Sequence, residues 1–127
     1  MAKTAAEMVA EARAKVPAVT AEEAAGLGDA LFVDLREPAE VEASGKVQGA
    51  VNVPRGMLEF RADPASAYHD KSFDPERTVV LYCASGGRAA LAGAALQELG
   101  YRDVRNMGGF KDWAEKGLPV EKEPPRE

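Results

Sequence analysis

Residues 78–88 read TVVLYCASGGR, in which an apolar, β-branched run meets a cysteine and then a loop of small residues. The run Thr78–Tyr82 is typical of a buried strand, and the alanine-rich residues after Arg88 have the spacing of a helix. This order of strand, loop and helix start aims several backbone N–H groups at one sulfur atom, that of Cys83. We expect such a sulfur to be a thiolate near neutral pH, and a thiolate is a nucleophile.

Most free cysteines are small buried apolar residues, and this is the alternative interpretation of Cys83. Three local features favour a functional thiol instead. Cys83 ends its strand, a run of small residues follows it, and Arg88 adds a positive charge at the start of a helix. The small residues allow the backbone to curl tightly, so that its N–H groups converge. These residues are Ala84, Ser85, Gly86 and Gly87.

Strand patterns alternate with helix patterns along the chain, which predicts an α/β fold with a mostly parallel sheet and helices on both faces. The expected strands are residues 17–19, 31–35, 50–53, 78–82 and 104–107. The expected helices are residues 5–16, a helix from 20 that ends near Gly26 or Gly28, and residues 37–44, 56–61, 88–99 and 110–116. Ligands of such folds bind beyond the carboxyl ends of the strands, where Cys83 lies.

The pattern therefore predicts one three-layer domain over residues 1–127, built on a five-stranded sheet. Its core is expected at about residues 17–120. An N-terminal helix at residues 1–16 precedes this core, and a loose tail at residues 121–127 follows it.

The composition excludes several classes of protein. A net charge of −5 without a basic cluster argues against nucleic acid as a partner. A single cysteine excludes an internal disulfide, and with one histidine a metal cage of cysteine and histidine ligands is not expected. No segment has the pattern of a membrane span or of a secretory signal. We therefore expect a cytoplasmic protein without metal or cofactor, in a reducing compartment that suits a free thiol.

Five segments carry a resemblance to a known family. They read VDLREPAE at 33–40, GKVQGAVNVP at 45–54, LYCASGGRAALA at 81–92, LGY at 99–101 and GGFKDW at 108–113. Together and in this order they resemble the motifs of the single-domain rhodaneses, which are sulfurtransferases. The chain departs from the family pattern at Lys46, where histidine is usual, and at Ala89, where serine often follows the loop arginine. The first departure is expected to cost a structural hydrogen bond, and the second to remove a hydroxyl from near the site.

The resemblance implies a rhodanese-like fold and a sulfurtransferase that works through a persulfide on Cys83, without a cofactor. The N–H groups of the loop would hold that persulfide. The implied partners are a small anionic sulfur donor such as thiosulfate and an acceptor that is a thiol, cyanide or a protein thiol. Asp34 and Arg36 are expected to lie near the loop and to order it. Arg88 is expected to attract anionic substrate, or to pair with a carboxylate such as Asp34. The loop residues concerned are Ala84, Ser85, Gly86, Gly87 and Arg88.

Two other functions remain open. Protein tyrosine phosphatases also use a cysteine-headed loop that ends in arginine, but theirs holds one residue more between the two than this chain does. A phosphoryl group brings several oxygens that need donors, whereas a persulfide adds a single sulfur and fits the tighter loop. Sulfur chemistry is therefore preferred over phosphate or arsenate chemistry. Rhodanese-like domains also serve as non-catalytic docking units, but those often lack the cysteine that this chain retains.

Overall fold

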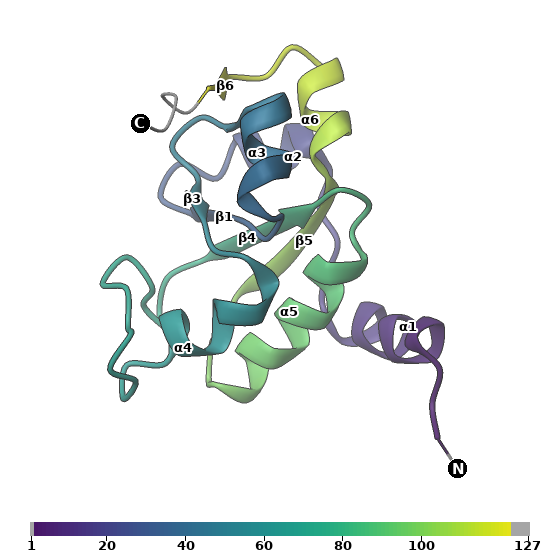
Figure 1. The fold of residues 1–127 in the computed structure, drawn as a ribbon, viewed down its shortest axis with the longest axis vertical. Coiled ribbons are helices and arrows are strands. Elements are labelled where there is room, and N and C mark those ends of the chain that lie inside the picture. Colours follow the sequence, from purple (N-terminus) through teal and green to yellow (C-terminus); the bar gives the residue numbers. More distant parts are fainter. Residues whose placement is uncertain (1, 123–127) are drawn as a thin grey trace.

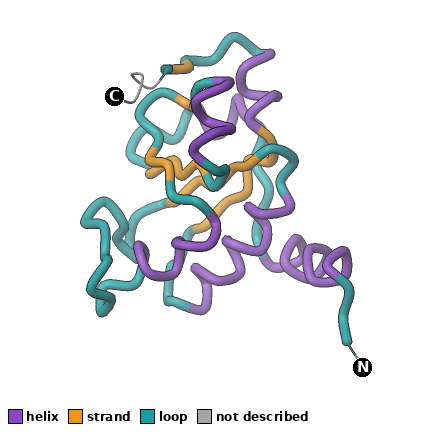
Figure 2. The backbone as a smooth tube through the Cα atoms, viewed as in Figure 1, coloured by secondary structure: helices purple, strands orange, loops and turns teal. Residues whose placement is uncertain are grey.

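A parallel sheet lies between two layers of helices in the computed structural model, which describes residues 2–122 (Figure 1). The main sheet has four strands in the order β3-β1-β4-β5. Figure 2 shows them as a central layer with helices on either side. The strands are β1 Leu31–Asp34, β3 Val51–Asn52, β4 Val79–Cys83 and β5 Val104–Gly109. The predicted α/β fold, with a mostly parallel sheet and helices on both faces, is confirmed.

The helices divide between the two faces of the sheet. The apolar cluster on one face joins the sheet to α4, α5 and the end of α1, and the cluster on the other face joins it to α2 and α6. α3 lies on the same side as α2 and α6 (Figure 1). No helix within residues 2–122 is both long and apolar enough to cross a membrane. The helices are α1 Ala5–Lys15, α2 Ala21–Ala25, α3 Pro38–Ser44, α4 Leu58–Ala62, α5 Gly87–Glu98 and α6 Phe110–Glu115, with a 3-10 turn, η1, at Arg55–Met57.

β4 lies in the interior of the sheet and is buried along its whole length. Successive side chains of a strand point to opposite faces. The odd-numbered residues of β4, Cys83 included, therefore join the cluster beneath α5. Val80 and Tyr82 join the cluster beneath α2 and α6. The strand period thus places the Cys83 sulfur on the face covered by the helix that follows it.

The fifth strand expected at residues 17–19 is wrong, because this segment forms only a single parallel bridge between Ala18 and Asn106. The N–H of Val19 donates to Asn106 O at 3.0 Å, and the N–H of Asn106 donates to Pro17 O at 2.9 Å. Pro17 has no N–H to lengthen the ladder, and Thr20 already caps α2. The segment is therefore a short extra edge beside β5.

Glu121 is paired with another strand, although a loose tail was expected from this residue onward. β6 (Val120–Glu121) runs antiparallel to β2 (Lys46–Val47). The N–H of Gly49 also donates to the Glu121 carboxylate at 2.6 Å, which is a charge-assisted bond. The prediction of a loose tail is thus wrong for Glu121, whereas residues 123–127 lie outside the described residues. These contacts join segments far apart in sequence, so no local pattern announces them.

Tyr82 connects β4 to the small β2–β6 sheet. Its hydroxyl accepts the Val47 N–H at 3.0 Å inside the core. Burial raises the pKa of this hydroxyl well above its ordinary value. We expect Tyr82→Phe to lower the free energy of unfolding by about 1–3 kcal/mol, since the buried Val47 N–H loses its partner. Urea denaturation measures the change.

Tyr68 provides the matched control, because it is 61% exposed. We expect Tyr68→Phe to change the free energy of unfolding by no more than about 0.5 kcal/mol. Equal stability of the two variants would contradict the role given to the Tyr82 hydroxyl.

Candidate active site

Cys83 is the last residue of β4 and lies at the edge of the sheet where the carboxyl ends of the parallel strands meet. A tight turn follows, and α5 begins at Gly87. Gly86 adopts φ +96°, in the left-handed region that favours glycine. In this conformation its N–H donates to Cys83 Sγ at 3.0 Å. The loop therefore curls back on the sulfur, and Gly86 supplies the amide that contacts it.

The Cys83 sulfur is buried, and it also contacts a polar backbone group. Cys83 is 1% exposed and belongs to the apolar cluster beneath α5, which by itself fits a purely structural cysteine. The Gly86 amide at 3.0 Å is what a purely apolar environment lacks. The first N–H groups of α5 have no intrahelical acceptors, and no side chain of its N-cap residue, Gly86, covers them. The sulfur therefore faces the positive end of a helix.

Asn106 holds the loop against β5 and is not among the residues predicted for the site. Its Nδ2 donates to Gly86 O at 3.2 Å, and its Oδ1 accepts the Gly108 N–H at 2.8 Å. Nearby, a side chain on Gly109 would overlap the carbonyl oxygen of Ala84, so β5 and the loop pack backbone to backbone. A polar residue in the last apolar strand was the available signal for Asn106.

Arg88 forms an ion pair with Glu40 of α3. Its two terminal nitrogens donate to the Glu40 carboxylate at 2.8 and 3.1 Å. The expected pairing of Arg88 with Asp34 is wrong, because Arg36 engages both oxygens of Asp34. The hydrogen bond from Arg88 lowers the pKa of Glu40 to about 2. Glu40 raises the pKa of Arg88 in turn, and Cys83 adds to this effect.

This strand, cysteine loop and helix can be compared with known proteins. Residues 18–116 match the model of the rhodanese-like domain. This chain belongs to the rhodanese-like domain family. The match covers the whole parallel sheet and the cysteine loop and begins after α1.

Two relatives of this rhodanese-like domain are named for sulfur transfer. A protein of Allochromatium vinosum named sulfurtransferase is 38% identical over 93 residues, covering 72% of this chain and 78% of the relative. Thiosulfate sulfurtransferase PspE of Escherichia coli is 37% identical over 83 residues, covering 65% of this chain and 73% of the relative. A solved structure from Rhodopseudomonas palustris, described as a protein of unknown function and a possible tyrosine phosphatase, has a TM-score of 0.87 at 36% identity. The structural match covers 95% of this chain and 96% of the chain from Rhodopseudomonas palustris.

Asp34 and Arg36 form a buried ion pair within the rhodanese-like domain. Arg36 Nη2 lies 2.7 Å from Asp34 Oδ2, and the two side chains are 5% and 0% exposed. The same nitrogen donates to the carbonyl oxygen of Gly45 at 2.8 Å, so the pair holds the end of α3. α3 carries Glu40, the partner of Arg88. The structure thus links the predicted pair to the cysteine loop through α3.

The two departures from the family pattern have clear surroundings. Lys46 Nζ donates to the carbonyl oxygen of Ala50 at 2.6 Å. The flexible lysine side chain thus makes a hydrogen bond of its own to a backbone oxygen at this position. Ala89 is fully buried in the cluster beneath α5, where its methyl group packs as part of the core.

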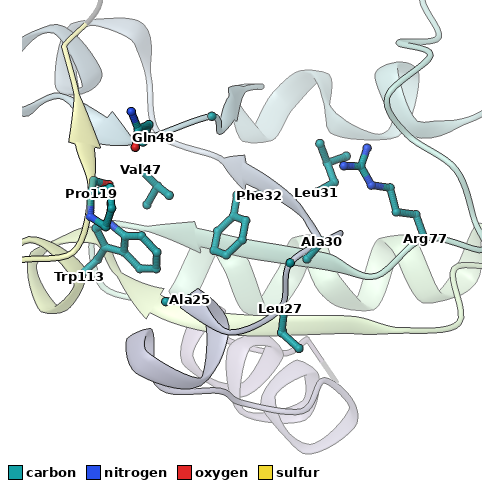
Figure 3. A pocket seen from close by; sticks show the side chains of 12 residues that line it. Ala25, Leu27, Ala30, Leu31, Phe32, Val47, Gln48, Arg77, Trp113 and Pro119 are labelled. Atoms are coloured by element: carbon teal, nitrogen blue, oxygen red, sulfur yellow. The ribbon is translucent and has the colours of Figure 1, made fainter.

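A cavity of about 310 Å³, which Cys83 does not line, lies beside β1 (Figure 3). Phe32, Val47 and Trp113 line it together with Arg77. The cavity adjoins the amino end of β1, whereas ligands of parallel sheets bind at the carboxyl ends. Within residues 2–122, no group of three or more His, Cys, Asp or Glu side chains could hold a metal ion. The Cys83 loop is therefore the candidate site.

The Arg88–Glu40 pair should give stability a defined pH dependence. The pKa of Glu40 falls from its ordinary 4.5 to about 2 on folding, so the pair stabilises the fold above the unfolded value and loses its effect as the pH falls toward 2. We expect Arg88→Met to be less stable than wild type above about pH 5, and this difference to shrink between about pH 4.5 and 2. Both side chains are 35–38% exposed, so solvent screening limits the full difference to about 1 kcal/mol.

Urea denaturation at several pH values measures this difference. The control is the same Arg88→Met substitution made in a Glu40→Gln background, where the difference should not vary with pH. If the stability difference between wild type and Arg88→Met stayed constant down to about pH 3, this would argue against the Glu40 assignment.

Proposed function

We propose that this rhodanese-like domain is a sulfurtransferase that acts through a persulfide on Cys83. It moves a sulfane sulfur from thiosulfate, or from a related small anionic donor, to a thiophilic acceptor. The observation that carries the proposal is the position of Sγ at the carboxyl edge of the sheet, 3.0 Å from the Gly86 amide and at the start of α5. The relatives named sulfurtransferase and thiosulfate sulfurtransferase support it.

The first step forms the persulfide. The Cys83 thiolate attacks the outer sulfur of thiosulfate, a new S–S bond forms, and the S–S bond of the donor breaks. The electron pair of the broken bond leaves with sulfite, and the outer sulfur of the persulfide carries the remaining negative charge. We expect the loop amides of residues 84–88 to stabilise that anion, as preorganised donors stabilise an oxyanion.

The second step returns the enzyme to its starting state. A thiol, cyanide or a protein thiol attacks the outer sulfur, and the electron pair of the Cys83 persulfide bond returns to Sγ as a thiolate. With cyanide the product is thiocyanate. No electron enters or leaves over the cycle, so the reaction as written needs no redox partner. Two successive displacements predict ping-pong kinetics.

Access to the sulfur depends on the loop. Cys83 is 1% exposed, whereas the next two residues in the chain, Ala84 and Ser85, are exposed. We expect the donor to approach through this exposed part of the loop. A small donor with a terminal sulfur suits this route better than a bulky one.

Phosphate chemistry is the second candidate function, because the similar structure from Rhodopseudomonas palustris is described as a possible tyrosine phosphatase. The loop of this chain places four residues between Cys83 and Arg88. A phosphoryl group presents more oxygens than this short loop can surround, which favours sulfur transfer. Turnover of p-nitrophenyl phosphate compared with that of thiosulfate separates the two functions.

Intact mass spectrometry tests the persulfide directly. We expect thiosulfate to add the mass of one sulfur atom to the wild-type protein and cyanide to remove it again. Cys83 is the single cysteine of the chain, so Cys83→Ser should show no gain of mass and no thiocyanate production. Wild-type protein that turned thiosulfate over with no sulfur adduct would count against the covalent route.

Two controls accompany this measurement. Circular dichroism of Cys83→Ser should show the wild-type content of helix and strand, so that loss of activity is not loss of fold. A wild-type protein that neither gains sulfur nor turns over phosphate would favour the third possibility, a non-catalytic docking unit.

A further inference from the structure

Arg13 of α1 lies beside the cysteine loop, although α1 precedes the residues that match the family model. A Cβ built on Gly86 would be 3.3 Å from Arg13 Nη2 and 3.6 Å from Nη1. Because the Gly86 N–H is itself 3.0 Å from Cys83 Sγ, the guanidinium lies no more than about 9 Å from the sulfur. The side chain is also exposed, so a solute can reach it.

The last turn of α1 is fixed against α5. Ala12 and Val16 are each 4% exposed, and Val16 belongs to the cluster beneath α5. The methyl groups of Val16 would lie 2.8 Å from a Cβ on Gly93, so the absence of a side chain there allows close packing. The side-chain amide of Gln97 donates to the carbonyl oxygen of Lys15 at 2.9 Å. The position of Arg13 beside the loop therefore follows from packing of the helix.

The arginines near this edge of the sheet differ in whether a carboxylate pairs with them. Arg88 pairs with Glu40, and its positive charge is largely offset. Two further arginines follow strands at this edge of the sheet, and both are paired. Arg36 pairs with Asp34, and Arg55 pairs with Glu59. Within residues 2–122, the Arg13 guanidinium forms no ion pair and no hydrogen bond. It is thus a positive charge at the loop without a carboxylate to offset it.

We propose that Arg13 binds the anionic group of the sulfur donor and so selects negatively charged donors for Cys83. This inference rests on the proposed function, since it concerns the donor of that reaction. The family's core supplies the loop and the sulfur, and α1 supplies the charge that attracts the donor. Because the guanidinium is exposed, its effect should weaken as salt screens it.

Steady-state kinetics with thiosulfate and cyanide give the first readout. We expect Arg13→Gln to raise the KM for thiosulfate by about two- to five-fold, the range of an exposed ion pair, with a smaller change in kcat. Arg13→Lys should recover part of the loss. Lys15→Gln removes the same charge two residues farther along α1 and should leave the KM for thiosulfate unchanged.

Alkylation of Cys83 gives a second readout that needs no sulfur transfer. Iodoacetate is an anion and iodoacetamide is neutral, and both react with the single cysteine. We expect Arg13→Gln to lower the ratio of the iodoacetate rate to the iodoacetamide rate by a similar factor, and Lys15→Gln to preserve it. Added salt should reduce the ratio more in wild type than in Arg13→Gln.

The outcomes separate the inference from the proposed function. If Arg13→Gln and Lys15→Gln agree in both KM and alkylation ratio, the inference is wrong. If both alkylation rates of Arg13→Gln fall together, Arg13 supports the loop without attracting anions, which also overturns it. If wild type does not turn thiosulfate over but its alkylation ratio still depends on Arg13, the proposed function fails and the anion-attracting role of Arg13 stands.

Discussion

The hydrogen bond from the Gly86 amide to the Cys83 sulfur depends on a backbone conformation that few residues adopt, and the rest of the site is arranged around it. At φ +96° a side chain on Gly86 would be strained, and its Cβ would also lie 3.2 Å from the Cα of Gly108. Asn106 then holds the carbonyl of Gly86 from the other side. The loop is therefore held by β5 as well as by its own sequence.

Two ion pairs of different kinds shape the charge at this edge of the sheet. The pair between Asp34 and Arg36 is buried, and burying charges costs about as much as their attraction returns, so its value lies in fixing geometry. Arg36 of this pair also binds the carbonyl oxygen of Gly45 at the end of α3. α3 carries Glu40, the partner of Arg88. The second pair is partly exposed and offsets the positive charge of the loop arginine. Arg13 lies beside the same loop and, within residues 2–122, has no carboxylate partner.

Much of the fold and the centre of the site could be predicted from local patterns. The apolar run that ends at Cys83 forms β4, and the small residues after it form the loop. Thr20 caps α2 in the predicted capping box. The predictions that failed concern long-range contacts: the single bridge at Ala18, the pairing of Glu121, and the partner of Arg88. Each depends on which segments meet after folding, and a local pattern carries no such information.

The sequence by itself determined the order of the four main-sheet strands and of the helices, and it placed Cys83 at the end of a strand, because strand and helix periods act over a few residues. It also determined that the loop could curl, since glycine permits the conformation that Gly86 adopts. Only the tertiary structure decided which charges offset one another at the loop. Glu40 and Arg88 are 48 residues apart in the chain, and they meet because α3 follows β1 and α5 follows β4, two neighbouring parallel strands whose carboxyl ends lie at the same sheet edge. Arg13 reaches the loop for the same kind of reason, because Val16 anchors α1 in the core beside Gly93.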